Sequence, residues 1–371
     1  MPNGVHVYGR RYKPYGDKNY PLEIQKNREM TENRDQAIWA LAQGETFDLA
    51  AADAGTVELA EISTNYKPSK KNGSKEYLYG EDALDSLTIA DGFQIELFAD
   101  ERQFPNLANP VQMSFDNKGR LWIATMPSYP HFQPGDAKPD DKILIYEDTN
   151  GDGKADKETV FADGLSLPMG FELAPEGVYV SLAPDLVLMR DTNGDDVCDS
   201  MEVVITGFDH HDTHHAISAF CADPSGGIML SEGIFLHTNT ETVRGPVRGV
   251  NGGFYRYDPR KKHLERTVQT KIPNPWGVAF DEWGQDFFLH TSSTKVNWML
   301  PVSVKTSYGV ANASTTDLIP KGNRVRPTSG LEFVSSSHFP AEMRGDMLLC
   351  NNIGFLGIKQ HKIEEDGTVT R

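Results

Sequence analysis

Cysteine and long apolar runs are both scarce in this 371-residue chain. Only Cys198, Cys221 and Cys350 occur, which is too few for a disulfide scaffold, and there is no C-x-x-C-H haem attachment motif. An odd count permits one disulfide and does not indicate a compartment. No stretch of 18 apolar residues is present, so no segment is expected to span a membrane.

The chain also lacks an apolar signal-peptide core at its start and an excess of positive charge. The start, MPNGVHVYGRRYKPYG, has no apolar core of a signal peptide. We therefore expect either a cytosolic protein or a longer precursor whose first residues are missing here. Positive charge is in deficit, with 36 Lys and Arg against 53 Asp and Glu and a net charge of -17. This balance argues against binding a nucleic-acid phosphate backbone, which requires clustered cations.

Residues 1–86 are polar and are interpreted as an N-terminal extension and linker, irregular apart from one helix. That helix is predicted over Thr31–Gln43, with Thr31 or Asn33 as its N-cap. Its apolar face would consist of Ala37, Ile38 and Leu41. The segment Asn65–Lys75 (NYKPSKKNGSK) is typical of an exposed linker.

Residues 87–371 show short β runs separated by turn signals, together with a repeat. Each repeat has an apolar strand, a tight turn and a second strand, and a later segment such as KILIYEDTN, GGFYRYDPR or GIKQHKIEED supplies a third. Because the repeats recur every roughly 45–60 residues, the pattern predicts an all-β propeller whose blades pack on their neighbours. The five repeats are Asn109–Thr125, Leu167–Leu182, His215–Leu230, Asn274–Leu289 and Pro327–Cys350.

Ring closure requires a further strand, and Gly92–Ala99 (GFQIELFA) is placed to supply it. A sixth pair of inner strands is missing before Arg371. Either the ring has five blades or, as we prefer, the fold is a six-bladed β-propeller whose last blade is absent from this sequence.

Two Asp/Asn-rich loops have the oxygen spacing of a calcium loop. The first has Gly153 at the position of the sharp turn, whereas the second has Asp196 there. Neither loop has the flanking helices of an EF-hand, and the first lacks the glutamate at position 12, so solvated turns are the alternative. We predict that both loops bind calcium, which would stabilise the edges of the blades. The predicted ligands are Asp148, Asn150, Asp152, Lys154 and Asp156 in the first loop, and Asp191, Asn193, Asp195, Val197 and Asp199 in the second.

A histidine motif, His210-His211-Asp212-Thr213-His214-His215, lies directly before an inner strand. In a propeller this position is at the mouth of the central channel. Imidazole suits proton abstraction near neutral pH, and the same set could bind a transition metal. A chance polar turn is the third alternative. We favour a base over a metal ligand, because a metal should leave a clearer ligand spacing.

Residues at the starts of other inner strands should line the same mouth. A flat aromatic ring, amides and guanidinium groups there would suit a planar anionic cofactor or a sugar. The predicted binding residues are Asp212, His214, Asn274, Trp276, Arg324 and Arg326, with the segment Asn109–Gln112 beside them.

From about Leu87 onward the chain resembles the glucose/sorbosone dehydrogenases that use pyrroloquinoline quinone. It most closely resembles the membrane-bound dehydrogenase domain of planctomycete-type bacteria. The matching segments include DGFQIELFA, NPVQMSFDNKGRLWIA, DTHHAISAFCADPSGGIML, NPWGVAFDEWG and SGLEFVSSSHFPAEMRGDMLL. The resemblance implies that His215, nine residues before Pro224, takes the sugar hydroxyl proton while hydride passes to the quinone. It also implies a cytochrome c electron acceptor and a periplasmic or secreted location.

Two positions depart from the pattern of that family. Pro273 stands where the family has an arginine that contacts the cofactor, and Asn351 and Asn352 stand where it has a lysine. Arg324 or Arg326 would have to substitute. Two other functions therefore stay open: a metal-dependent lactonase or lyase whose histidines hold the metal that activates water, and a non-catalytic, calcium-stabilised carbohydrate-binding propeller.

Overall fold

The computed structural model describes residues 20–59, 78–129, 135, 137–270, 272–300, 306–312, 317–325, 327–352, 355–366 and 369–370. The chain forms two compact units. The first consists of Met1–Gln103 and Pro127–Asp140, and the second of Phe104–Met126 and Asp141–Arg371. In the described residues no helix is both long enough and apolar enough to cross a membrane.

Where it is described, the first unit contains three helices, and the residues between and after them have no regular secondary structure. Its helices are α2 (Tyr20–Ala42), α3 (Leu49–Ala54) and α4 (Gly80–Asp85). Pro21 suits the first turn of α2, and no glycine or further proline follows before Gly44, so nothing interrupts the helix.

The predicted helix over Thr31–Gln43 is the second half of α2, but its predicted start was wrong. Thr31 and Asn33 lie inside α2, where the Thr31 hydroxyl donates to the carbonyl of Asn27 at 2.7 Å and does not cap the helix. Ile38 and Leu41 are exposed. The predicted apolar face is therefore not buried.

Polar contacts join α2 to α3. Asp48 caps α3 by accepting from the backbone N–H of Ala51 at 2.9 Å. Arg34 of α2 forms an ion pair with Asp53 of α3 at 2.9 Å.

The expected linker Asn65–Lys75 lies outside the described residues. The predicted closing strand was wrong, because Gly92–Ala99 forms no strand. A strand requires a partner edge, and none of the sheets in the described residues includes this segment.

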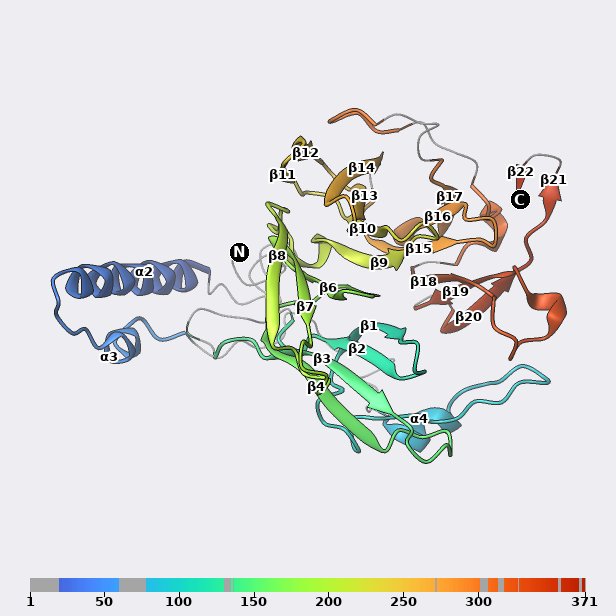
Figure 1. Ribbon diagram of the computed structural model, residues 1–371, viewed down its shortest axis with the longest axis horizontal. Coiled ribbons are helices and arrows are strands. Elements are labelled where there is room, and N and C mark those ends of the chain that lie inside the picture. The colour runs from blue at the N-terminus through green and yellow to red at the C-terminus, as the bar shows by residue number, and fades with distance from the viewer. Residues whose placement is uncertain are drawn as a thin grey trace. The chain divides into compact units, whose positions relative to one another are not determined.

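The second unit is a β-propeller with five blades, each an antiparallel sheet (Figure 1). The five repeats expected from the sequence are confirmed as the inner strands of these blades. Blade 1 contains β1 (Pro110–Phe115), β2 (Leu121–Thr125), β3 (Asp141–Glu147) and β4 (Lys157–Leu165). Blade 2 contains β5 (Phe171–Ala174), β6 (Gly177–Leu182), β7 (Asp185–Arg190) and β8 (Ser200–Thr206).

The remaining blades follow in chain order. Blade 3 contains β9 (Ser218–Ala222), β10 (Ile228–Glu232), β13 (Gly253–Asp258) and β14 (His263–Gln269), with an inserted hairpin of β11 (Asn239–Thr242) and β12 (Gly245–Arg248). Blade 4 contains β15 (Pro275–Phe280), β16 (Asp286–His290) and β17 (Lys295–Trp298). Blade 5 contains β18 (Thr328–Phe333), β19 (Met347–Asn351) and β20 (Gly357–His361), and a short pair, β21 (Glu365–Asp366) and β22 (Val369–Thr370), follows.

Neighbouring blades bury their apolar faces against each other, which is the packing a propeller requires. Between blades 3 and 4 the rings of Phe254 and Phe288 lie 5.2 Å apart, and similar clusters fill the other inter-blade layers. The first strands of consecutive blades are neighbours in the order β1, β5, β9, β15 and β18. Gln112 of β1 joins two of them by donating to the carbonyl of Phe171 in β5 at 2.6 Å. The starts of distant repeats therefore converge.

Five blades are present in the described residues, and the sixth stays a prediction. Along β1 the side chains alternate, so that Gln112 faces blade 2 while Val111, Met113 and Phe115 are exposed. Cys198, Cys221 and Cys350 are all free thiols, so the disulfide that the count permitted is not formed.

Candidate functional site

The histidine motif lies between β8 and β9, where one turn of 3₁₀ helix (η1, Thr213–His215) positions it. The carbonyl of His215 accepts from the backbone N–H of Gly233 at 2.8 Å, which ties the turn to the end of β10. His215 is only 4% exposed. A Cβ at Gly233 would lie 2.7 Å from its imidazole ring, so this close approach requires glycine.

Both ring nitrogens of His215 have partners within the protein. Nδ1 lies 3.0 Å from the carbonyl oxygen of Ile234 and 3.3 Å from a carboxylate oxygen of Asp212. Since both of these oxygens accept, Nδ1 carries a hydrogen. Nε2 lies 3.2 Å from Oδ1 of Asn274 at the start of blade 4, and the Asn274 amide donates to Ser292 at 2.9 Å. His215 therefore links blades 3 and 4.

The orientation of the Asn274 amide is linked to the charge of His215. With Oδ1 toward the ring, Nε2 must also carry a hydrogen, and the imidazole is charged. With the amide exchanged, Nδ2 donates to a neutral Nε2 and Oδ1 accepts from the Ser292 hydroxyl. Asn274 can therefore satisfy either protonation state of His215.

His214 differs from His215 in its access to solvent. Its side chain is 38% exposed, and its Nδ1 lies 2.7 Å from Oδ1 of Asp212. In the part of the chain that the structure describes, its Nε2 has no hydrogen-bond partner. Asp212 holds the ring through Nδ1 and leaves Nε2 without a partner among the described residues, and a triad carboxylate likewise holds its histidine through Nδ1.

Asp212 is the charged centre of this group. Burial alone would raise the pKa of its carboxyl, but hydrogen bonds from His214 and His215 and the charges of their rings together hold that pKa well below its ordinary value. One ligand atom from each of Asp212, His214 and His215 lies within 4.8 Å of the other two, close enough to hold one metal ion. We call these three residues the histidine cluster.

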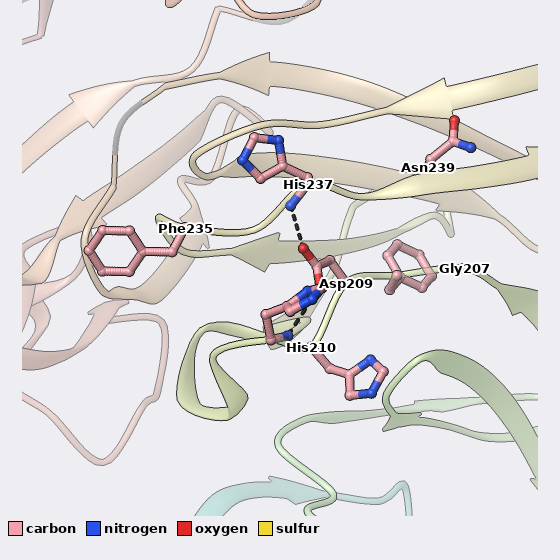
Figure 2. A pocket seen from close by; sticks show the side chains of 8 residues that line it. Gly207, Asp209, His210, Phe235, His237 and Asn239 are labelled. Carbon is pink, nitrogen blue, oxygen red and sulfur yellow. Dashed lines mark hydrogen bonds and ion pairs between the residues drawn. The ribbon is translucent and has the colours of Figure 1, made fainter. Parts of the chain in front are cut away.

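Residues of the histidine motif line an open pocket of about 480 Å³ (Figure 2), and its Phe235 ring lies 5.9 Å from the ring of His215. Its walls include His210 and His211 from the motif and three residues that the sequence analysis did not single out, Asp209, Phe235 and His237. Asp209 pairs with Nδ1 of His211, as Asp212 pairs with Nδ1 of His214. The sequence signal for Asp209 was thus a repeated Asp-x-His spacing. His237 and Phe235 carry no such signal, because tertiary packing brings them to the motif.

The structure brings Asn274 to the histidine cluster. It does not bring the predicted cations there. Arg324 forms an ion pair with Asp317 and donates from Nε to the carbonyl of Ile319 at 3.0 Å. Arg326 lies outside the described residues. Trp276 is half-exposed on β15.

The described residues supply no free cation from the predicted set for an anionic quinone. Within the described residues, Arg324 is the one predicted cation, and its charge is already paired with Asp317. The two asparagines at the position of the expected lysine form hydrogen bonds within the protein. Asn351 is buried and donates to the carbonyl of Leu349 at 3.0 Å, and Asn352 accepts from the Ser329 hydroxyl at 2.9 Å. Asp212 adds a negative charge that would repel an anion.

The first Asp/Asn-rich loop is held by its own backbone. The carboxylate of Asp148 accepts from the N–H groups of Gly151 at 2.7 Å and Gly153 at 2.8 Å. The bond from Gly153 contributes most to lowering the pKa of Asp148. Thr149 donates to Asp156 at the far end of the loop. These bonds keep Asp148 ionised and hold the two ends of the loop together, and the predicted calcium here stays a prediction.

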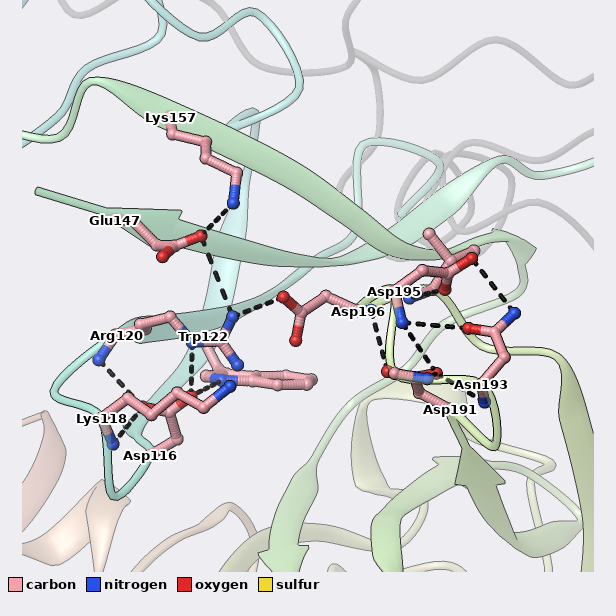
Figure 3. Close-up of polar contacts among 12 residues, drawn as sticks. Asp116, Lys118, Arg120, Trp122, Glu147, Lys157, Asp191, Asn193, Asp195 and Asp196 are labelled. Carbon is pink, nitrogen blue, oxygen red and sulfur yellow. Dashed lines mark hydrogen bonds and ion pairs between the residues drawn. The ribbon is translucent and has the colours of Figure 1, made fainter. Parts of the chain in front are cut away.

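The second loop repeats this arrangement around Asp191, with one difference that the structure explains (Figure 3). Asp196 replaces the glycine and has a left-handed φ of 65°. Its carboxylate lies 2.7 Å from Nη1 of Arg120 in blade 1. The aspartate therefore provides a contact between blades that glycine could not. Calcium in this loop also stays a prediction.

Fold and site together define a β-propeller with an Asp/His cluster at the start of an inner strand. A family model matches residues 80–371, and the chain belongs to that family, which is described as "Domain of unknown function (DUF7133)". No curated protein matches the chain.

Three solved structures similar to the chain have low sequence identity. A luciferin-regenerating enzyme shares 12% identity, with 68% of this chain and 72% of that chain covered and a TM-score of 0.43. A glucose dehydrogenase shares 12% identity, with 69% and 81% covered and a TM-score of 0.39. Regucalcin, a calcium-binding protein from Agrobacterium tumefaciens, shares 12% identity, with 68% and 74% covered and a TM-score of 0.40.

Proposed function

We propose that this protein is an enzyme that removes a proton from a hydroxyl group of a sugar or related alcohol, as one half of an oxidation. The observation that carries the proposal is the hydrogen-bonded histidine cluster, in which an ionised Asp212 holds both His214 and His215. An imidazole that gains a proton becomes a cation, and an adjacent carboxylate stabilises that cation. The described residues thus supply the proton-accepting half of the reaction.

The two histidines have different parts in this proposal. The resemblance assigns the base to His215, which is buried and has both ring nitrogens bonded. A substrate hydroxyl can reach His215 only if Asn274 or Ile234 gives up its bond. Nε2 of His214 has no partner among the described residues, so no bond has to be given up there. In the alternative division of roles, His214 receives the proton, and His215 holds Asp212 in place.

Oxidation also requires an acceptor for two electrons. Because the described residues supply no free cation from the predicted set for pyrroloquinoline quinone, no hydride step is assigned to that cofactor. A cytochrome-type protein stays the proposed final acceptor, and the periplasm or the outside of the cell stays the proposed location.

The test is dye-linked oxidation of a panel of aldoses and polyols, with and without added quinone, by the wild type and three variants. We expect His214→Gln and His215→Gln each to lower kcat/KM at least 100-fold, because general-base catalysis contributes about 10²- to 10⁴-fold. His338→Gln is the matched control, since His338 is exposed and remote from the cluster in sequence. Full activity in both cluster variants would refute the proposal.

A second candidate function is metal-assisted hydrolysis of a cyclic sugar ester, of the lactonase type. The favouring observation is the 4.8 Å grouping of Asp212, His214 and His215, since two histidines and a carboxylate are a common ligand set for zinc. A bound metal would supply Lewis-acid activation of water. Metal analysis of the purified protein, followed by lactone hydrolysis before and after chelation, separates this function from oxidation.

We further propose calcium as a structural cofactor of the two Asp/Asn-rich loops. The support is the ligand spacing in the sequence and the backbone bonds that converge on Asp148 and Asp191. The proposed role is to stiffen the edges of blades 1 and 2.

A further inference from the structure

We propose that the pocket formed by Phe235, Asp209, His210, His211 and His237 binds a neutral, hydroxylated ring such as a pyranose. We call it the Phe235 pocket. Its volume of about 480 Å³ lies within the range of small-molecule sites. The inference deepens the proposed function and rests on it for the location of the reacting hydroxyl, but binding itself can be measured without turnover.

The strongest observation is the conformation of Phe235. Its φ is 74°, in the left-handed region that a bulky side chain rarely adopts, and its side chain is 63% exposed. Such a backbone conformation persists only where neighbouring contacts hold it. Here the backbone N–H of Phe235 donates to Oδ1 of Asn251 at 3.3 Å, and Leu236 beside it is fully buried.

With this backbone conformation, the aromatic side chain of Phe235 is exposed next to the histidine cluster. The ring of Phe235 lies 5.9 Å from the ring of His215. The residue between Phe235 and Gly233 is Ile234, whose carbonyl accepts from Nδ1 of His215. A ring stacked on Phe235 would therefore lie beside the cluster, where one of its hydroxyls could meet the free nitrogen of His214.

The polar wall of the pocket is held rigidly. The carboxylate of Asp209 is only 8% exposed and accepts from the backbone N–H groups of His237 at 2.6 Å and His211 at 3.0 Å (Figure 2). The Asp209 N–H donates to Thr238 at 3.0 Å, and Thr238 in turn donates to the buried Glu232 at 2.6 Å. Glu232 forms an ion pair with Arg266 in the core of blade 3. A chain of bonds therefore fixes the wall to the blade.

The chemistry of the lining selects the class of ligand. An exposed aromatic face suits the apolar face of a sugar ring, and the imidazoles of His210, His211 and His237 can donate to or accept from hydroxyl groups. Burial would raise the pKa of Asp209, but the bonds from His237 and His211 lower it, so the carboxylate is ionised. No Lys or Arg lines the pocket in the described residues. The pocket should therefore prefer neutral polyols to anions.

The test is binding of methyl β-D-glucopyranoside, measured by saturation-transfer NMR and titration on the full chain. This probe is neutral, and without an added electron acceptor it cannot be oxidised, so it reports binding alone. We expect Phe235→Ala to raise the Kd at least tenfold, with Trp283→Ala, at another exposed aromatic, as the matched control. Phe235→Asn, which tolerates a left-handed φ, should lose binding without loss of stability. D-Glucuronate should bind more weakly than the glucoside.

The outcomes separate the pocket from the proposed reaction. Wild-type protein that does not bind the glucoside, or Phe235→Ala that binds it as well as the wild type, would overturn the pocket. Binding that persists in His214→Gln while no sugar is turned over by the wild type would leave the pocket standing and remove the proposed reaction. Equal binding of glucuronate would overturn the predicted preference for neutral ligands.

Discussion

Arg120 and Asp196 form a contact between two blades, with 2.7 Å between Nη1 and Oδ2. Arg120 lies on the turn between β1 and β2, and Asp196 lies in the loop between β7 and β8. Arg120 also bonds Asp116 at 2.7 Å, so the guanidinium joins two carboxylates. Hydrogen bonds from Trp122 and Arg120 outweigh burial and lower the pKa of Asp116 to about 2. All three groups are therefore charged at neutral pH.

We predict that Asp196→Asn destabilises the propeller by about 1 kcal/mol, because a partly buried charged hydrogen bond is weakened. Asparagine tolerates the left-handed φ, so the backbone of the loop should not change. The measurement is the midpoint of urea unfolding. Asp163→Asn, the same change at an exposed position of β4, is the control and should leave the midpoint unchanged. Equal midpoints for the two variants would show that the contact between blades adds no stability.

The sequence predicted the blades well because their signals are local. Each unit joins an apolar strand to a tight turn, and the turn at Asp116–Gly119 closes through its own backbone bond. The histidine motif was also local, and it lies directly before β9, as the sequence indicated, while its place at the mouth of the channel stays a prediction. Gly92–Ala99 looked like a strand because its side chains suit one, but strand formation also requires a partner edge, which the sequence of the segment does not show.

Contacts that depend on packing could not be predicted from the sequence. Arg324 has the right charge for an anionic cofactor, but Asp317 neutralises it. Phe235 carries no motif, and only its left-handed backbone and exposure distinguish it from core phenylalanines. Asp196, which replaces the consensus glycine of the loop, bonds Arg120 in another blade, 76 residues away in the sequence.

Calcium should raise the thermal stability of the protein. If both loops bind the ion, saturation at 100 times the Kd stabilises each site by about 2.7 kcal/mol. We expect the Tm of the wild type to rise on adding calcium and to fall with a chelator, and Asp148→Ala to lose part of this response. Magnesium at the same concentration is the control, since it demands a tighter octahedral site. A Tm that does not change with calcium would identify the loops as solvated turns.

Asp286, buried at the start of β16, should make stability depend on pH. Burial raises the pKa of its carboxyl to about 6, and the charges of Asp223 and Asp281 add to the effect. The unfolded pKa is about 4, so the folded state keeps a proton that the unfolded state loses between about pH 4 and pH 6. The contribution of Asp286 is therefore fully present below pH 4 and is lost as the pH rises through 6.

Asp286→Asn should remove this dependence. We expect the variant to gain about 3 kcal/mol over the wild type at pH 7 and little at pH 4, from denaturant unfolding at both values. Asp163→Asn again serves as the exposed control. A gain of the same size at both pH values would assign the effect to packing and not to the proton.

Asn274 should stabilise the fold through the link it makes between His215 and Ser292. Asn274→Ala leaves Nε2 of His215 and the Ser292 hydroxyl without this partner, and an unpaired buried polar group costs about 1–3 kcal/mol. We expect a fall in unfolding free energy of that size, together with a change in the ¹⁵N shift of the His215 ring in histidine-labelled protein. Ser292→Ala is the comparison, because it removes only the outer bond and should leave the His215 signal closer to wild type. If both variants shift the His215 signal equally, Asn274 acts through the geometry of the loop and not through its bond to the ring.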